Sequence, residues 1–235
     1  GGRRCGIFVL IPFRDENPMR IVPLVTYGLL LTCLLVFAWQ ATLPGPVQQR
    51  VILSLGLIPA VLFGHAALPP VLDLVPPTAT IFTSMFLHGG IMHLAGNMLF
   101  LWIFSDNVEE ALGHVRFALF YGLCGVAAAM AQALPDVTSQ IPMIGASGAV
   151  SGVLGAYLLL YPHARVALLA PVGFSLRPVK LPAVWVLGCW FLLQLMSSLL
   201  VGGEVGGVAF RAHLGGFVAG MLLVPLMRPG RFLRR

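Results

Sequence analysis

Two side chains capable of nucleophilic catalysis occur in apolar segments of this sequence. Ser147 lies in a GASG motif at 145–148, at the start of one such segment, and His213 lies in an AHLGG motif at 212–216, near the start of another. Ionisable and nucleophilic side chains are rare in hydrocarbon and usually have a function there. A serine hydroxyl becomes a nucleophile when a neighbouring base, most often a histidine, takes its proton. The pair therefore predicts covalent catalysis, provided that the two segments pack together.

A third segment carries donors for a developing oxyanion. His93 and Asn97 are spaced i, i+4, which puts both side chains on one face of a helix. Their N–H groups, with the backbone N–H of Ser147, are predicted to form an oxyanion hole. His88 lies a turn or more before His93, and for it a structural role is favoured over ordering water at the mouth of the site.

Small residues spaced four apart on the serine and histidine segments predict that these two helices pack closely. The two ridges are Ser147, Ser151 and Gly155, with Gly148 and Gly152 beside them, and Ala212, Gly216 and Gly220, with His213 adjoining. The alternative interpretation is that the glycines serve packing alone and that the histidine only hydrogen-bonds another helix. The matching depth of the polar groups, estimated below, favours catalysis.

The composition is that of an integral membrane protein. Hydrophobic residues make up 58% of the chain and charged residues 9%, and the mean hydropathy is +0.94. The net charge of +6 does not indicate nucleic-acid binding, because the basic residues gather at chain ends and in short loops. The four cysteines are widely spread and signal neither a disulfide framework nor a metal site. We expect no metal and no organic cofactor.

The predicted fold class is an all-α bundle of six transmembrane helices, forming a single domain over 1–235 with short cytoplasmic tails at about 1–18 and 228–235. The first segment is interpreted as a retained span rather than a signal peptide. The predicted spans are about Ile21 to Trp39, Gly90 to Phe104, Phe117 to Leu134, Ser147 to Tyr161, Leu181 to Val201 and Val208 to Met227.

The basic residues predict the orientation. With six spans, all but two of the fourteen lysines and arginines fall on the side of the chain ends, which is therefore predicted to be cytoplasmic. The exceptions are Arg50 and Arg211. The longest connection, between the first two spans at roughly Pro44 to His88, then lies outside, and its apolar residues predict partial burial in the membrane interface.

The orientation brings the polar residues to one depth. At 1.5 Å per residue, Ser147, His213 and His93 each lie about 20–22 Å from the cytoplasmic end of their helix, on the order of 10 Å beneath the outer surface. Pro142 and Gly145 break the chain before Ser147, so a helix is predicted to begin there with free N–H groups. Irregular backbone at this depth is tolerated only where it is buried in protein or faces a water-filled cavity, and we expect a cavity open to the outside.

The acidic residues do not supply a third member of a triad. Asp106, Glu109 and Glu110 fall at the wrong face of the membrane, and Asp136 and Glu204 fall in outer loops. The expected machinery is thus a Ser-His dyad. The remaining histidines, His65, His114 and His163, are expected to be solvated or interfacial.

The order and depth of these motifs resemble the rhomboid intramembrane serine proteases, with the HLAGN motif at 93–97 as the third element. The resemblance covers most of the chain. It implies Ser147 as nucleophile, His213 as general base and then acid, and His93, Asn97 and the Ser147 backbone as oxyanion donors. It also implies transmembrane proteins as substrates, cut near the outer face, with helix five (Leu181 to Val201) as a mobile gate.

Two positions depart from the family pattern. Ser151 stands where many members have an aromatic residue that stacks on the histidine, so the orientation of His213 is open. Ser105 stands where glycine is common, which affects packing.

Two other functions remain as alternatives. A catalytically silent relative would hold or escort membrane helices, and a small transporter would use a polar cavity lined by histidine. The short tails favour a bacterial plasma membrane as the location. Substrates are expected to carry small residues at the cut and helix-weakening glycine or proline nearby.

Overall fold

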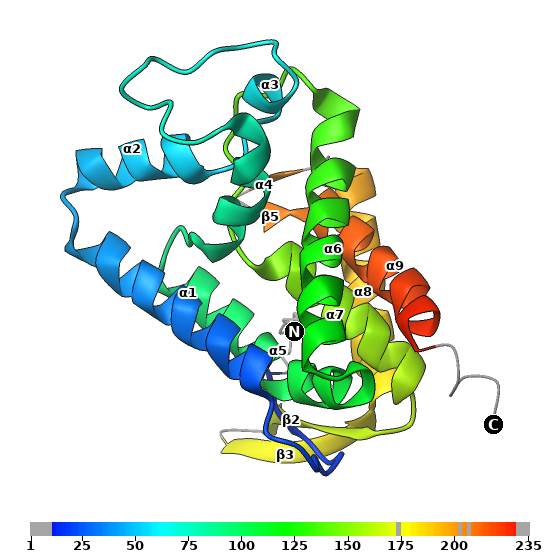
Figure 1. Cartoon of the computed structure of the whole chain (residues 1–235). Helices are drawn as coiled ribbons and strands as arrows, with labels where there is room; N and C mark the ends of the chain where they lie inside the picture. The colour runs from blue at the N-terminus through cyan, green and yellow to red at the C-terminus, as the bar shows by residue number, and fades with distance from the viewer. Residues whose placement is uncertain (1–10, 173–174, 202–203, 206–207, 229–235) are drawn as a thin grey trace, which may run out of the picture.

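The computed structural model describes residues 11–172, 175–201, 204–205 and 208–228. Its longer helices make up the body of the molecule, and a small sheet lies at one end (Figure 1). Residues 1–10 and 229–235, which include Cys5 and most of the predicted tails, lie outside the described residues.

The helices account for most of the described chain. The α-helices are α1 (Leu24–Thr42), α2 (Gly45–Leu55), α3 (Pro59–Leu62), α4 (Thr80–Thr83), α5 (Ile91–Leu112), α6 (His114–Ala133), α7 (Ser147–Leu160), α8 (Ala183–Val201) and α9 (Phe210–Met227). Short 3₁₀ helices are η1 (Pro77–Ala79), η2 (Ser84–Phe86) and η3 (Leu134–Asp136). The strands are β1 (Ile11–Asp15), β2 (Arg165–Val172), β3 (Ser175–Pro182), β4 (Glu204–Val205) and β5 (Val208–Ala209).

Each of the six predicted spans contains a helix, but not all of these helices are clear spans. Four are long and apolar enough to cross a membrane, namely α1, α6 with η3, α8 and α9. The segment 77–86 and α5 would make a fifth as a pair bent by 83°. Helix α7, with 14 residues, is shorter. The described residues therefore indicate a multi-pass membrane protein with four or five clear spans, and the count of six stays a prediction.

The connection between α1 and α5 is more ordered than the predicted loop. It contains α2, α3, η1, α4 and η2, and proline occupies the first turn of α2, α3 and η1. A proline there costs no hydrogen bond, because the first N–H groups of a helix have no partner within it. Prolines of this connection thus mark the starts of three of its helices.

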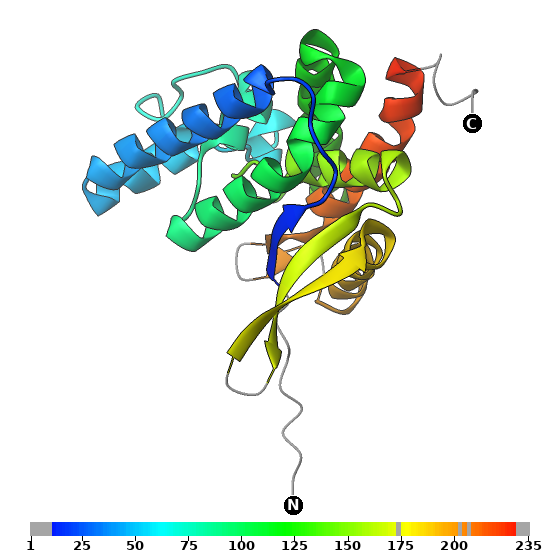
Figure 2. The ribbon, with the colours of Figure 1, turned by 90° about the horizontal axis from the view of Figure 1, so that it is seen from below.

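The prediction of an all-α fold was too narrow. Strands β1, β2 and β3 form an antiparallel sheet in that order, which lies at one end of the bundle (Figure 2). Val166 and Leu168 on β2 pack into the helical core, and Ala167 between them is also buried. Sequence periodicity missed the sheet because prolines interrupt all three strands and because β1 pairs with a strand from the other half of the chain.

Helix α7 is at the centre of the bundle, packed against α5, α6 and α9 (Figure 1). Most of its side chains are buried. Its glycines allow contact with the α9 backbone, since a Cβ on Gly216 would overlap the carbonyl of Gly148 and one on Gly220 would overlap that of Gly152. The two helices therefore approach as closely as the small residues predict.

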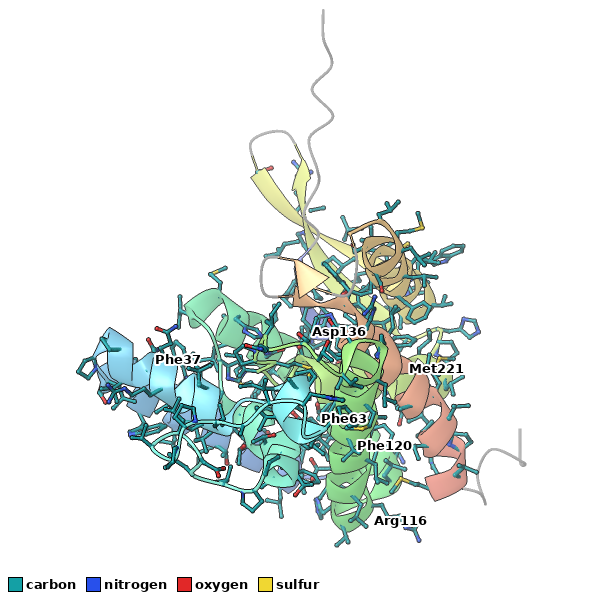
Figure 3. All side chains as sticks on the ribbon, turned by 90° about the horizontal axis from the view of Figure 1, so that it is seen from above. Phe37, Phe63, Arg116, Phe120, Asp136 and Met221 are labelled. Carbon is teal, nitrogen blue, oxygen red and sulfur yellow. The ribbon has the colours of Figure 1, made fainter. Side chains whose placement is uncertain are left out.

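The acidic residues of α5 are held at the end of the bundle that carries the sheet. The buried carboxylate of Glu109 accepts hydrogen bonds from the backbone N–H of Val25 and Thr26 at 2.9 and 2.8 Å and from the Thr26 hydroxyl at 2.7 Å. His114 Nδ1 lies 2.6 Å from Glu109, so His114 has a specific partner instead of being simply solvated. Helix α6 carries Arg116 at one end, and Asp136 follows its other end (Figure 3).

Candidate active site

Ser147 and His213 meet where α7 and α9 begin. Ser147 is the first residue of α7, and the Ser147 hydroxyl donates to His213 Nε2 across 2.8 Å. The backbone contact between the two helices is what brings these side chains within bonding reach. A hydroxyl bonded to the free nitrogen of an imidazole is the arrangement from which a serine can attack a carbonyl.

The second ring nitrogen of His213 is bonded to α8. Nδ1 donates to Oε1 of Gln194 at 2.7 Å, and the ring of Trp190 lies 5.9 Å from the His213 ring, centre to centre. Sequence reasoning named neither α8 residue. The sequence does contain a sign of this contact. Gln194 is the one amide side chain in an otherwise strongly apolar helix, and such residues usually bridge helices in membranes.

His93 and Asn97 face the chain just before Ser147. A Cβ placed on Gly145 would lie 2.6 Å from His93 Nε2 and 3.6 Å from Asn97 Nδ2. The backbone N–H of Gly89 donates to His93 Nδ1 at 3.4 Å, which leaves Nε2 to carry the ring proton. Asn97 is buried, and its Nδ2 has no hydrogen-bond partner among the described residues. Two N–H donors therefore point to one place beside the serine.

Gly145 allows this approach in two ways. Its φ of +118° is in the region that L side chains rarely adopt, and any side chain there would collide with His93. The turn is fixed by the connection between α1 and α5, since Gly145 N donates to Ser84 O at 2.9 Å and Met143 pairs with Leu57 through two backbone bonds. Because α7 starts at Ser147, the N–H groups of its first turn also face the site.

His88 supports His93 and does not contact the serine. Its ring is buried and meets the ring of His93 edge-on, with centres 5.3 Å apart. Gln40 holds the His88 backbone, accepting from its N–H at 3.2 Å and donating to its carbonyl at 3.4 Å. This geometry fits the structural role favoured from the sequence.

A cavity of about 830 Å³ contains the whole constellation. His93, Asn97, Gly145, Ser147 and His213 all line it, together with apolar residues from α5 to α9 that include Phe100, Leu154 and Trp190. The volume accommodates an extended peptide segment, and the polar groups converge at one point of a mostly apolar wall. Such a site can polarise and attack a carbonyl group.

The sequence matches the rhomboid domain family over residues 77–230, which is more than half of the chain and includes every residue that converges on this cavity. The chain belongs to the rhomboid family. It is 35% identical over 136 residues to the rhomboid protease GluP of Bacillus subtilis, a match that covers 57% of this chain and 26% of that protein.

Other rhomboid relatives differ in location and in activity. The mitochondrial rhomboid protein 1 of Saccharomyces cerevisiae is 29% identical over 157 residues, covering 64% of this chain and 42% of its own length. The inactive rhomboid protein 1 of Drosophila melanogaster is 28% identical over 142 residues, covering 60% of this chain and 9% of its own length. The chain thus matches less than half of the length of each of these relatives, and the family contains both proteases and a protein named inactive.

Proposed function

We propose that this rhomboid protein is an intramembrane serine endopeptidase that hydrolyses peptide bonds in or near transmembrane segments of other membrane proteins. The observation that carries the proposal is the 2.8 Å hydrogen bond between Ser147 Oγ and His213 Nε2 inside the cavity. Its position among oxyanion donors supports catalysis over simple helix bridging. The likeness to a bacterial rhomboid protease adds to this support.

The proposed reaction uses the dyad twice. His213 Nε2 takes the hydroxyl proton as Ser147 Oγ attacks the carbonyl carbon, and His93, Asn97 and the Ser147 backbone N–H donate to the oxyanion. The C–N bond then breaks, and the leaving amine takes the proton from His213, which leaves an acyl-enzyme. A water that gives its proton to His213 attacks this ester and releases the acid, and Ser147 regains its proton. No metal or organic cofactor takes part in these steps.

The substrate helix must unwind before it reacts, because its carbonyls are bonded within the helix. We infer that favoured substrates carry small residues at the cut and glycine or proline nearby, since these residues weaken a helix. The cut would lie near the outer face, with the termini of this chain in the cytoplasm, as the distribution of basic residues favours. Six spans in a bacterial plasma membrane are part of the same proposal.

The test compares the wild type with Ser147→Ala on single-span test substrates, with the full chain purified in detergent and products mapped by mass spectrometry. Ser147→Ala removes the nucleophile and leaves the helix packing untouched, so it should unfold at the wild-type temperature and produce no cleavage. A Ser147→Ala protein that cuts at the wild-type rate would exclude the mechanism.

An alternative function is that this chain is a catalytically silent protein that holds membrane helices, and the existence of an inactive Drosophila relative favours keeping this alternative. A fluorophosphonate, which reacts only with an activated serine, separates the two. Labelling of Ser147 that is lost in His213→Ala supports the enzyme. Binding of helical substrates without labelling, in detergent that preserves the fold, supports the silent protein.

A further inference from the structure

We propose that Gln194 of α8 is a positioning residue for His213, and that the catalytic dyad is complete only while α8 is docked on α9. The inference rests on the proposed function and adds a part to it. It starts from the 2.7 Å hydrogen bond between His213 Nδ1 and Gln194 Oε1, on the side of the ring opposite Ser147.

The amide oxygen selects one tautomer of the histidine. A neutral imidazole has one N–H donor and one acceptor nitrogen, and an amide oxygen can only accept. Bonded to Gln194, the ring carries its proton on Nδ1, and the lone pair of Nε2 faces the Ser147 hydroxyl. This is the orientation that a general base needs, and in Ser-His-Asp enzymes a carboxylate provides it. Gln194 provides it without a charge, which suits an apolar helix.

Helix α8 also replaces the ring contact that α7 does not make. Ser151, one turn after Ser147, donates its hydroxyl to the Ser147 carbonyl at 2.6 Å. Trp190 lies one turn before Gln194 on the same face of α8, and its ring is tilted by 34° to that of His213. Both groups that orient His213 from the side therefore come from one face of one helix.

Helix α8 packs against the rest of the protein mainly through the face that carries Trp190 and Gln194. Ala183 and Leu187 in its first turns are buried, whereas much of its remaining surface is exposed apolar side chain. Its principal helical partner is α9, through contacts of Trp190 and Phe191 with Phe217 at 6.0 and 4.7 Å between ring centres. A displacement of α8 would remove Gln194 and Trp190 together, and the His213 ring would then be free to rotate or to change tautomer.

The competing explanation is that Gln194 only ties α8 to α9, as polar side chains do between membrane helices. Both explanations predict some loss of thermal stability when the bond is removed. The two explanations make different predictions for the tautomer of His213 and for kcat. If Gln194 only ties the helices together, its removal should leave the tautomer unchanged and should not lower kcat selectively over KM.

The decisive variants are Gln194→Leu, which removes the acceptor, and Gln194→Glu, which keeps an acceptor at the same reach. Leu193→Ala, whose side chain is exposed on the same helix, is the matched control. In this chain, Gln194→Leu should lower both kcat and the rate of fluorophosphonate labelling by about 10- to 100-fold, with KM nearly unchanged. This is less than the loss of roughly 10⁴ caused by a side chain that imposes the wrong tautomer, because leucine imposes none. Gln194→Glu should recover most of the rate, and Leu193→Ala should resemble the wild type.

Nitrogen-15 spectra of histidine-labelled protein give a readout that needs no activity. The signal lost in His213→Ala identifies the residue, and we expect an Nδ1–H tautomer in the wild type and a mixture in Gln194→Leu. An unchanged tautomer and rate in Gln194→Leu would overturn the inference. If Gln194→Leu does not fold, Gln194→Met replaces it. A wild type that neither cleaves nor labels would remove the proposed function, while the spectra would still decide whether Gln194 fixes the ring.

Discussion

The two histidines that face Ser147 are held in opposite tautomers by their Nδ1 atoms. In His213, Nδ1 donates to Gln194, so Nε2 is left as an acceptor for the serine proton. In His93, Nδ1 accepts from the Gly89 backbone, so Nε2 is left as a donor facing Gly145. One residue type can thus serve as base at one position and as oxyanion donor at another, because the neighbouring groups differ.

We expect Asn97→Ala to lower kcat by about 100- to 1000-fold with little change in KM, since an oxyanion donor acts on the transition state more than on the bound substrate. Steady-state cleavage of a single-span substrate measures this effect. Leu119→Ala, on the exposed side of α6 and outside the cavity lining, is the control and should keep wild-type kinetics. An equal change of kcat in both variants would contradict the assigned role of Asn97.

The sequence was most informative about residues that stand in motifs. Ser147, His213, His93 and Asn97 were predicted to converge, and the structure brings them to one cavity. Gln194 and Trp190 were missed because their contact with His213 depends on how α8 rotates and docks, which no local pattern specifies. The role of His114 was likewise hidden, because its partner Glu109 becomes a buried acceptor only after α1 packs on α5.

At the scale of helices, the site depends on the absence of side chains between α7 and α9. Gly216 contacts the backbone of Gly148, next to Ser147, so the spacing of the two helices also sets the distance between Ser147 and His213. A change in the packing of α7 on α9 would therefore also change the distance between Ser147 and His213.

Gly216→Ala should lower both stability and turnover, because the new methyl group would meet the Gly148 carbonyl and force the helices apart. Overpacking of this kind costs about 1–3 kcal/mol. Gly122→Ala on α6 is the matched control, since nothing lies within 4 Å of its Cβ position. That control should be neutral or stabilising by up to about 1 kcal/mol, because alanine favours helix over glycine. Thermal unfolding in detergent and cleavage assays would test both, and a fully active Gly216→Ala would be incompatible with the close approach.

For the molecule as a whole, the sheet joins the start of the described chain to the end of α7. Asp15 on β1 accepts hydrogen bonds from the Tyr157 hydroxyl at 2.6 Å and from Asn107 Nδ2 at 3.1 Å. Glu16, the next residue, pairs with Lys180 on β3. Helices α5 and α7 and two strands therefore meet at one polar cluster.

This cluster predicts a pH dependence of stability. The pKa of Asp15 is raised from its ordinary value of 3.8 to about 6, chiefly by burial; the Tyr157 hydrogen bond opposes the rise and the Asp106 carboxylate adds to it. Because the folded chain holds this proton more tightly than the unfolded chain, the stabilisation is complete below about pH 3.8 and is lost as the pH rises through about 6.

Asp15→Asn should abolish this component of the pH dependence, since the amide stays neutral and its oxygen still accepts from Tyr157. Thermal unfolding of the wild type and of Asp15→Asn between pH 4 and pH 7, about the range set by the two pKa values, measures the difference. The wild type should lose stability relative to the variant as the pH rises. Parallel curves for the two proteins would show that Asp15 does not titrate in this range.

At this largest scale, composition and periodicity predicted a membrane protein of packed apolar helices, and the breaks at Pro142 and Gly145 predicted where α7 starts. The pairing of β1 with β2 escaped prediction because it joins residues as far apart in sequence as Ile11 and Leu169, and such long-range register is set by the completed fold. The local hairpin of β2 and β3 escaped because its prolines argue against a strand. Most of the helices before α5 escaped because α3, η1, α4 and η2 have only three or four residues each, which is too short for a helical period to show.

The bond between Asp15 and Tyr157 has a practical consequence for anyone shortening this protein. Tyr157 lies near the end of α7, the helix that begins at Ser147, so trimming the polypeptide past Asp15 would remove a hydrogen bond that holds the far end of this helix. An expression plasmid that starts at the first apolar helix would therefore encode a less stable protein, although Ser147, His213, His93 and Asn97 would all still be present.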